Sequence, residues 1–264
     1  MEPFLKWAGG KRWLTRSAEF IAPVQYIRYV EPFLGGGSVF FFLAPTEGVI
    51  NDRNKDLMNL YRVLRDHPLG LQDMIQWHQS KHSDEHYYHV RAENPQDKLE
   101  RAARFLYLNR ACWNGLYRVN RFGQFNVPTG TKSKVFFESD NYLEASNLLK
   151  KMKLRSTDFE KIVDSATNGD FVFIDPPYTV KHNLNGFLKY NERIFSWEDQ
   201  VRLAASVRRA VARGCKVAVT NADHESLRDL YDFADYRPLS RASVIAGNAV
   251  KRVVTTEALF TANY

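Results

Sequence analysis

Cysteine is scarce in this sequence, and long apolar runs are missing from it. The two cysteines among 264 residues, Cys112 and Cys215, are too few for a disulfide framework and favour a reducing compartment. The most apolar stretch, residues 39–44, is far shorter than the roughly 18 residues that a membrane span needs. Residues 1–11 lack the apolar core of a secretory signal. We therefore expect a cytoplasmic protein without a membrane partner.

Acidic residues are absent from one long segment, residues 101–137. The same segment contains seven basic residues: Arg101, Arg104, Arg110, Arg118, Arg121, Lys132 and Lys134. The chain has 37 Lys and Arg against 30 Asp and Glu, so these seven equal the whole net charge of +7. A basic run alone is often a solvated face. Because aromatic residues such as Trp113 and Tyr117 are interleaved with it, the segment favours contact with nucleic acid.

Strand and helix patterns alternate in the first and last parts of the chain. Strands are expected at 26–33, 48–52, 153–156, 170–175, 216–220, 242–246 and 256–260. Helices are expected at 39–43, at 57–64 and at 203–211, and the second of these should end at 66–68. Between these parts the alternation lapses, and only one clear helix, through Leu99 and Leu106, is expected before Tyr142. The pattern predicts an α/β fold on a parallel sheet, with a main domain of residues 1–55 and 146–264 and an inserted domain of residues 56–145.

A glycine turn and a carboxylate follow the first two expected strands. Gly35, Gly36 and Gly37 end the first strand and Asp52 ends the second, near the spacing of a nucleotide-binding unit. The turn lacks the full G-x-G-x-x-G pattern, so a ligand site and a tight structural turn are equally compatible with it. The FLKWAGGK segment at 4–11 is either a basic tail with one packed tryptophan or a ligand site. As a ligand site, it would offer an aromatic ring and an ammonium to an adenine ring and a carboxylate.

The tetrapeptide at 175–178 directly follows an apolar strand. Ligands of open α/β sheets bind at the carboxyl ends of strands, so we expect chemistry there. The carboxylate of Asp175 and the carbonyl of Pro176 can each accept one N–H of an exocyclic base amine, and Pro177 helps to fix the direction of the chain. Tyr178 offers a flat ring to a base that has left the duplex. Taken alone, the tetrapeptide is also a common way to end a strand.

In this order, the motifs resemble those of the Dam-type DNA adenine-N6 methyltransferases. The matching segments are FLKWAGGK at 4–11, EPFLGGGSVF at 31–40, NDRNKDLMN at 51–59, LYLN at 106–109, NGLYRVNRFGQFNVP at 114–128 and DFVFIDPPY at 170–178. Glu257 and the terminal Asn263 and Tyr264 fit the closing pattern of the family. The resemblance implies a Rossmann-like methyltransferase sheet with an inserted, mainly helical target-recognition domain. It also implies methyl transfer from S-adenosylmethionine to the adenine amine in double-stranded DNA by base flipping, with GATC as the leading target.

The motifs and the resemblance together assign roles to individual residues. Catalysis is expected of Asp175, Pro176, Pro177 and Tyr178. Cofactor binding is expected of Trp7, Lys11, Phe33, Gly35, Gly37, Asp52, Asp158, Phe159 and Asp175. The resemblance implies that Asp158 holds the adenine of the cofactor while Phe159 packs beside it. DNA contact is expected of Lys6, Trp113, Asn114, Leu116, Arg118, Arg121, Pro128 and Lys132. Thr131 stands where the family commonly has a basic residue, and Lys132 follows it.

Two other functions remain compatible with the sequence. One is methylation of the cytosine amine, although those enzymes more often have Ser in place of Asp175. The other is a DNA-binding protein that keeps the fold without activity. Methylation of a cytosine carbon needs an attacking thiolate, and neither cysteine has an evident histidine base. The resemblance implies a prokaryotic or phage-infected cell and leaves open a separate restriction endonuclease as a partner.

Four histidines lie close together in the sequence, at 78, 82, 86 and 89. Gln79 stands where a zinc protease motif would need Glu, and no cysteine is near. We therefore expect no metal and interpret this stretch as a solvated polar helix or loop.

Overall fold

The computed structural model describes residues 1–264 except 18–19, 21, 116, 121–122, 181–194 and 243–253. Contacts divide the chain into two compact units, each made of two segments. Unit 1 combines Met1–Ser17 with Leu34–Ser156, and unit 2 combines Ala18–Phe33 with Thr157–Tyr264. The described residues form seven strands with helices between them, which confirms the expected α/β class.

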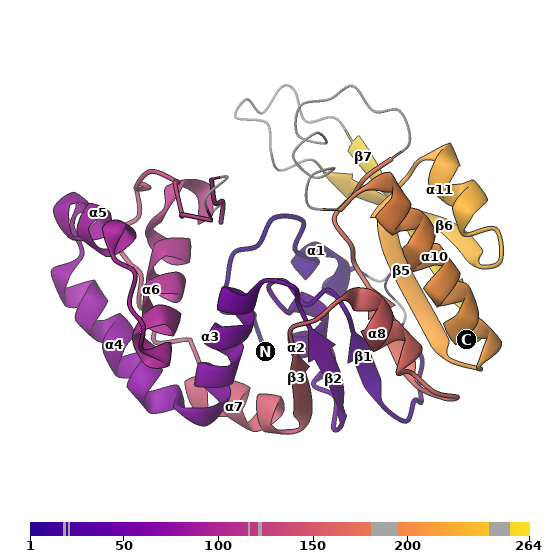
Figure 1. Cartoon of the computed structure of the whole chain (residues 1–264), viewed down its shortest axis with the longest axis horizontal. Helices are drawn as coiled ribbons and strands as arrows, with labels where there is room; N and C mark the ends of the chain where they lie inside the picture. Colours follow the sequence, from indigo (N-terminus) through magenta and orange to yellow (C-terminus); the bar gives the residue numbers. More distant parts are fainter. Residues whose placement is uncertain (18–19, 21, 116, 121–122, 181–194, 243–253) are drawn as a thin grey trace. The chain divides into compact units, whose positions relative to one another are not determined.

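Unit 2 contains a mixed arrangement of strands in the order β1-β4-β5-β7-β6 (Figure 1). Their bounds are Tyr29–Glu31 for β1, Phe171–Ile174 for β4, Lys216–Ala222 for β5, Asp235–Ala242 for β6 and Val254–Ala262 for β7. Strand β4 runs parallel to both β1 and β5, whereas β7 runs antiparallel to β5 and β6. All four residues of β4 are apolar and buried, as is typical of a central strand in a parallel sheet.

The described helices of unit 2 are α8 (Phe159–Asp164), α10 (Trp197–Ala212) and α11 (Glu225–Leu230). Helix α10 begins with a capping box, in which Ser196 and Asp199 satisfy each other's backbone N–H groups. It packs against α8, as Figure 1 shows. This contact between two helices carries the ion pairs described below.

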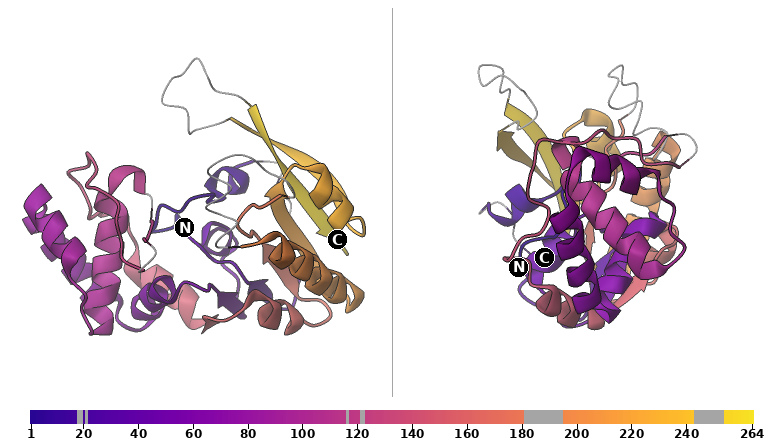
Figure 2. Two further views of the ribbon diagram at one scale, coloured as in Figure 1. Left: turned by 45° about the horizontal axis from the view of Figure 1, so that its top comes forward. Right: turned by 90° about the vertical axis from the view of Figure 1, so that its left-hand side faces the viewer.

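Unit 1 contains two parallel strands, β2 (Gly48–Asn51) and β3 (Met152–Arg155). Its helices are α1 (Arg12–Thr15), α2 (Ser38–Leu43), α3 (Lys55–Asp66), α4 (Pro68–Lys81), α5 (Asp84–Ala92), α6 (Lys98–Ala111), the short 3₁₀ helix η1 (Trp113–Gly115) and α7 (Tyr142–Lys150). Asn54 caps α3 by accepting two backbone N–H groups. Helix α6 packs against α3, α4 and α5, and Figure 2 shows this helical group from two sides. The boundaries 56–145 of an inserted domain stay a prediction.

The structure differs from the sequence-based expectation in the histidine-rich stretch. Two helices, α4 and α5, precede α6 where one helix was expected in all. The interpretation as a solvated stretch is wrong for His78, which is 4% exposed and stacks on Tyr107 with 4.5 Å between ring centroids. The apolar stripe of α4 is narrow, with Leu71 and Ile75 buried, and His78 extends it.

Two strand boundaries also differ. The first strand is shorter than expected, since β1 covers only Tyr29–Glu31. Strand β6 spans Asp235–Ala242, so it ends where a strand at 242–246 was expected to begin. The rest of that expected strand lies outside the described residues.

Two of the seven basic residues at 101–137, Arg104 and Arg110, serve the interior of unit 1, and Arg101 forms an ion pair on its surface. Arg101 pairs with Asp56 at 2.5 Å, and Arg104 donates to two backbone carbonyls of α5. Arg110 is buried and pairs with Asp140 at 2.6 Å. The interpretation of the whole run as a nucleic-acid surface is therefore wrong for Arg104 and Arg110, because their charge is used within the fold. Arg118, Lys132 and Lys134 are exposed, and Arg121 lies outside the described residues.

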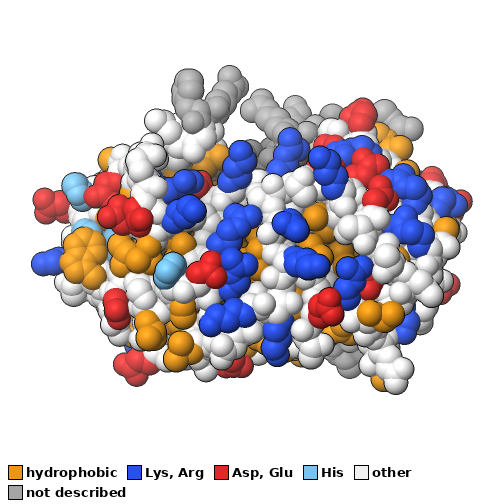
Figure 3. Space-filling model, turned by 60° about the horizontal axis from the view of Figure 1, so that its bottom comes forward, with side chains coloured by type: hydrophobic (Ala, Val, Ile, Leu, Met, Phe, Trp, Pro, Cys, Tyr) orange, Lys and Arg blue, Asp and Glu red, His pale blue; other side chains and the backbone are white. Residues whose placement is uncertain are grey.

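Basic side chains are not confined to that run. Figure 3 shows many Lys and Arg side chains on one face of the molecule, with Asp and Glu side chains among them. None of the helices in the described ranges combines the length and apolar character that a membrane crossing requires.

Candidate active site

The Asp-Pro-Pro-Tyr motif lies at the carboxyl end of β4, and side chains from two other strands hold it. Thr220, on the neighbouring strand β5, donates its hydroxyl to Asp175 Oδ1 at 2.8 Å. Tyr178 donates its hydroxyl to Glu257 Oε2, on β7, at 2.6 Å. Both polar side chains of the motif thus have a fixed partner at the end of the sheet where ligands bind.

Tyr178 stays neutral in this environment. Burial, followed by the carboxylates of Asp175 and Glu257, raises its pKa well above the usual range. The hydroxyl is therefore a hydrogen-bond donor to Glu257 at any ordinary pH, and the ring keeps one orientation.

A buried amide pair lies behind the two prolines. Gln200, on α10, donates to the carbonyl of Pro177 at 3.4 Å and accepts from Asn221 Nδ2 at 3.1 Å. Both amide side chains are fully buried. Neither of them was predicted from the sequence, and neither was Thr220. The available signal was the polar pair Thr-Asn that ends the apolar run of β5.

Three aromatic rings and a carboxylate form a second group in unit 2. Phe33 follows β1 and stacks on Phe159 with 5.4 Å between centroids, and Phe195 contacts both rings at 5.5 Å. Asp158 caps helix α8 by accepting the N–H of Glu160 at 3.0 Å. A carboxylate beside an aromatic cluster suits a flat ring that carries an amino group.

In unit 1, the glycine turn packs against Trp7. Gly35 has a φ of +49°, and a Cβ atom there would lie 2.7 Å from a ring carbon of Trp7, so no other residue fits. The Gly35 N–H donates to Asp52 Oδ2 at 3.0 Å, and the Asn54 N–H donates to Oδ1 at 2.9 Å. Burial raises the pKa of Asp52, and these two donors oppose the shift. The residues at 35–37 thus form a tight turn, and its ligand-binding role stays a prediction.

The segment before the first strand is folded and is not a loose basic tail. Trp7 is half-buried and stacks against Tyr117 with 5.7 Å between centroids. Lys11 is 2% exposed, and its ammonium donates to the carbonyl of Gly9 at 2.8 Å. Gly37 has a φ of +69° and caps α2. The structure thus brings Trp7, the turn and Asp52 together in unit 1.

Apart from Lys6, the expected DNA-contact residues that the structure describes lie on an exposed loop region after α6. Trp113 is 52% exposed, and its backbone N–H donates to the carbonyl of Pro128 at 3.0 Å. Asn114 adopts a left-handed conformation with a φ of 55°, which is uncommon outside glycine. The Arg118 Nε donates to Asn126 Oδ1 at 3.0 Å, so its guanidinium has a preferred direction. Leu116 and Arg121 lie outside the described residues.

Lys6 and Lys132 place two ammonium groups near one another. A hydrogen bond that Lys132 donates to the neutral amine of Lys6, desolvation and the charge of Lys132 lower the pKa of Lys6 to about 8. The backbone of Lys6 is fixed by the Asn109 side chain, which accepts its N–H at 3.1 Å and donates to its carbonyl at 2.8 Å. Two close positive charges favour an anionic partner such as a phosphate.

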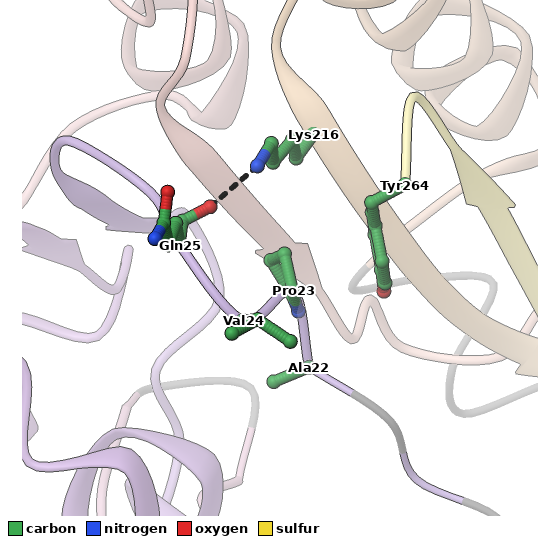
Figure 4. A pocket seen from close by; sticks show the side chains of 6 residues that line it. All are labelled: Ala22, Pro23, Val24, Gln25, Lys216 and Tyr264. Carbon is green, nitrogen blue, oxygen red and sulfur yellow. Dashed lines mark hydrogen bonds between the residues drawn. The ribbon is translucent and has the colours of Figure 1, made fainter.

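Two other features of the described residues lie apart from this chemistry. A pocket lined by Gln25, Lys216 and Tyr264 lies at the start of β5, the opposite end of the strand from Thr220 (Figure 4). Three or more His, Cys, Asp or Glu side chains do not gather anywhere in the described ranges as potential metal ligands.

The parallel strands β1, β4 and β5, the antiparallel β7 and β6, and the motif at the end of β4 define a Rossmann-like methyltransferase fold. The family model of the D12 class N6 adenine-specific DNA methyltransferases matches residues 7–245. The chain belongs to this family. The resemblance to Dam-type enzymes is thereby confirmed, and the family favours adenine over the cytosine amine.

The sequences of similar proteins align with most or all of this chain. The type II methyltransferase M1.LlaDCHI of Lactococcus lactis subsp. cremoris is 37% identical, covering 100% of this chain and 96% of its own length. The type II methyltransferase M.MjaIII of Methanocaldococcus jannaschii is 36% identical, covering 84% of each chain. The DNA adenine methylase of Serratia marcescens is 31% identical, covering 97% of this chain and 96% of its own.

Proposed function

We propose that this protein transfers a methyl group from S-adenosylmethionine to N6 of a flipped adenine in double-stranded DNA, with GATC as the leading target. One observation carries the proposal. At the carboxyl end of β4, Asp175 is held by Thr220 and Tyr178 is held by Glu257, which gives a fixed carboxylate beside a fixed aromatic ring. The family match supports adenine as the base.

The described residues fit S-adenosylmethionine. When bound, this cofactor supplies an electrophilic methyl group on a sulfonium. In unit 2, the aromatic rings of Phe33 and Phe159 and the carboxylate of Asp158 suit its adenine ring. In unit 1, Asp52 suits the ribose hydroxyls, since its carboxylate lies at the glycine turn. Trp7, Lys11, Gly35, Gly37 and Asp175 complete the proposed set.

The chain's own residues would activate the amine of the target adenine. Its lone pair is delocalised into the ring, which makes the nitrogen a poor nucleophile. The Asp175 carboxylate and the Pro176 carbonyl each accept one N–H, which turns the nitrogen toward tetrahedral geometry and aims its lone pair. The proton that N6 loses on methylation passes to Asp175. Positioning and electrostatics supply the rate, so the proposal needs no metal.

Features of unit 1 support base flipping and sequence readout. Trp113 is an exposed ring beside the left-handed residue Asn114, and such a ring can fill the space that an extruded base leaves. The guanidinium of Arg118 and the ammonium of Lys6 suit the O6 and N7 atoms of guanine, while Pro128 and Leu116 suit a thymine methyl. The contacts with GATC rest on this chemistry and on the family resemblance.

Two of the three similar proteins described above are named type II methyltransferases. We therefore propose that a separate restriction endonuclease recognises the same sequence and that methylation by this protein prevents its cutting.

The direct test of the target is a map of methylated bases in DNA from cells that express the protein. Plasmid from these cells should resist a nuclease that cuts only unmethylated GATC. Complete cutting of a plasmid that nevertheless contains N6-methyladenine would show that the activity is right and the target sequence wrong.

The test of the mechanism is the substitution Asp175→Ala. We expect loss of methylation to background, because one of the two acceptors of the amine is removed. The fold, measured by circular dichroism, and most of the affinity for duplex DNA should remain. Methylation at the wild-type rate would refute the role of Asp175, and absence of methylation by the wild type would favour a DNA-binding protein without activity.

A further inference from the structure

Arg202, on α10, lies at the centre of three carboxylates. Its two terminal nitrogens donate to the two oxygens of Asp158, at 2.7 and 3.0 Å. They also contact Asp199 at 2.9 Å and Glu160 at 3.1 Å. These hydrogen bonds raise the pKa of Arg202, so it is always charged. A two-point contact of this kind fixes the plane of a carboxylate, which a lysine cannot do.

The same guanidinium covers the ring of Phe159. Its central carbon lies 4.2 Å from the ring centroid, within the range of a cation–π contact. Phe33 also stacks on Phe159, with a 29° angle between the ring planes. One side chain therefore fixes both the carboxylate and the ring that the proposed function assigns to the adenine end of the cofactor.

We propose that Arg202 is a positioning residue that gives this site its preference for adenine. The proposal rests on the proposed function for the identity of the ligand. A carboxylate accepts an N–H from the amino group of adenine, whereas it repels the 6-oxo group of hypoxanthine. That discrimination requires the carboxylate to keep one direction relative to the ring. Arg202 and the N–H of Glu160 together set the direction of Asp158, and Arg202 also holds Phe159 beneath its guanidinium.

A purely structural role is the alternative, since Arg202 also links α10 to α8. Arg209 offers a matched control on the same helix. It pairs with Glu160 at 2.8 Å and with Asp164 at 2.7 Å, both on α8, and neither of these contacts involves Asp158 or Phe159. Arg209→Ala thus removes a link between the two helices and leaves the carboxylate and the ring in place.

The experiment compares the binding of two ligands to the full chain by calorimetry. S-adenosylhomocysteine carries the adenine amino group, and S-inosylhomocysteine carries an oxo group in its place. We expect the wild type to prefer the adenine compound. Arg202→Ala should weaken binding of that compound about tenfold, the order expected when a hydrogen-bonded charged pair is lost, and should bring the ratio of the two affinities close to one.

Two further variants separate the roles. Arg202→Lys keeps the charge and a link between the helices but loses the two-point contact, so its affinity ratio should also fall. If Arg202→Ala does not fold, the affinity ratio is measured with Arg202→Lys in its place. Arg209→Ala should keep the wild-type ratio. A wild-type ratio in Arg202→Lys, or an equal fall in Arg209→Ala, would refute the inference. A wild type that binds neither ligand would instead refute the proposed cofactor, and the inference with it.

Discussion

Thr220 shows how one hydroxyl can control the direction of a catalytic group. It donates to Asp175 Oδ1 at 2.8 Å from the strand beside β4, and it is fully buried. Since one carboxylate oxygen is held in this way, the direction in which the other oxygen can accept an N–H of the substrate is also set. Glu257 does the same for the ring of Tyr178 through a 2.6 Å contact. The motif supplies the chemistry, and these partners supply its geometry.

We expect Thr220→Val to lower kcat about tenfold and to leave KM for DNA within about twofold. A hydrogen bond to a charged group contributes about 1.5–3 kcal/mol, and this one acts on the reacting carboxylate and not on DNA binding. Thr220→Ser keeps the hydroxyl and should retain most of the activity. Steady-state transfer of a labelled methyl group measures both constants. Equal kcat values for the Val and Ser variants would show that Thr220 only fills space.

At the scale of elements, α4, α5 and α6 are joined by a group of histidines around two buried side chains, His78 and Tyr107. His78 Nδ1 and His86 Nε2 lie 3.0 Å apart, so one of the two ring nitrogens donates a hydrogen bond to the other. His82 contacts the Tyr107 hydroxyl and the carbonyl of Lys132, each at 2.8 Å. Burial lowers the pKa of His78 to about 4. The contact with Lys132 connects this packing to the exposed loop that we expect to bind DNA.

Because of this group of side chains, we expect the folded protein to lose stability in mild acid. An unfolded histidine takes up a proton near pH 6.5, whereas folded His78 remains neutral down to about pH 4. The unfolded state therefore binds more protons between these values, and the free energy of unfolding falls by up to about 1.4 kcal/mol per pH unit for this residue. Urea unfolding between pH 7.5 and 5 measures the slope.

His78→Gln removes the titrating group and should flatten that slope, although it lowers stability at pH 7.5. The matched control is His89→Gln, because His89 is exposed and paired with Glu93. It should leave the slope of the wild type. A steep slope that persists in His78→Gln would place the acid sensitivity elsewhere in the chain.

The elements that the sequence predicts well are those whose own apolar residues define a face. Helix α3 buries Leu57, Leu60 and Leu64 at helical spacing, and all four residues of β4 are apolar. Helix α4 was missed because His78 completes its buried stripe, and its partners Tyr107 and His86, on two other helices, make that position favourable. A local pattern does not contain such a partner.

The same reason separates the predicted part of the site from the rest. The tetrapeptide at 175–178 is continuous in sequence and follows a recognisable strand. Thr220 lies 45 residues from Asp175, and Arg202 lies 44 residues from Asp158. Only the pairing of β4 with β5 and the packing of α10 on α8 bring these pairs together. In the sequence alone, Thr220 and Arg202 cannot be distinguished from other polar residues, because their partners are distant along the chain.

At the scale of the whole molecule, the net charge of +7 does not show which basic side chains are available to the phosphates of DNA. Arg101 and Arg110 are paired with Asp56 and Asp140, and a cation that already has a carboxylate partner gains less from a phosphate. Lys132 and Lys134 are exposed in the loop after the recognition residues. The long-range attraction of DNA therefore depends on fewer residues than the sequence indicates.

We expect the double substitution of Lys132 and Lys134 by Ala to reduce the salt dependence of DNA binding. Each phosphate contact contributes about −0.9 to the slope of log affinity against log salt concentration, so loss of both should make the slope shallower by up to about 2. The matched control is Arg65→Gln with Arg101→Gln, which removes the same charge from residues paired with Asp66 and Asp56. It should leave the slope unchanged. Fluorescence anisotropy with a short duplex between 50 and 200 mM salt measures each slope. If the lysine variant keeps the wild-type slope, or the arginine variant loses as much, the phosphate contacts lie outside this loop.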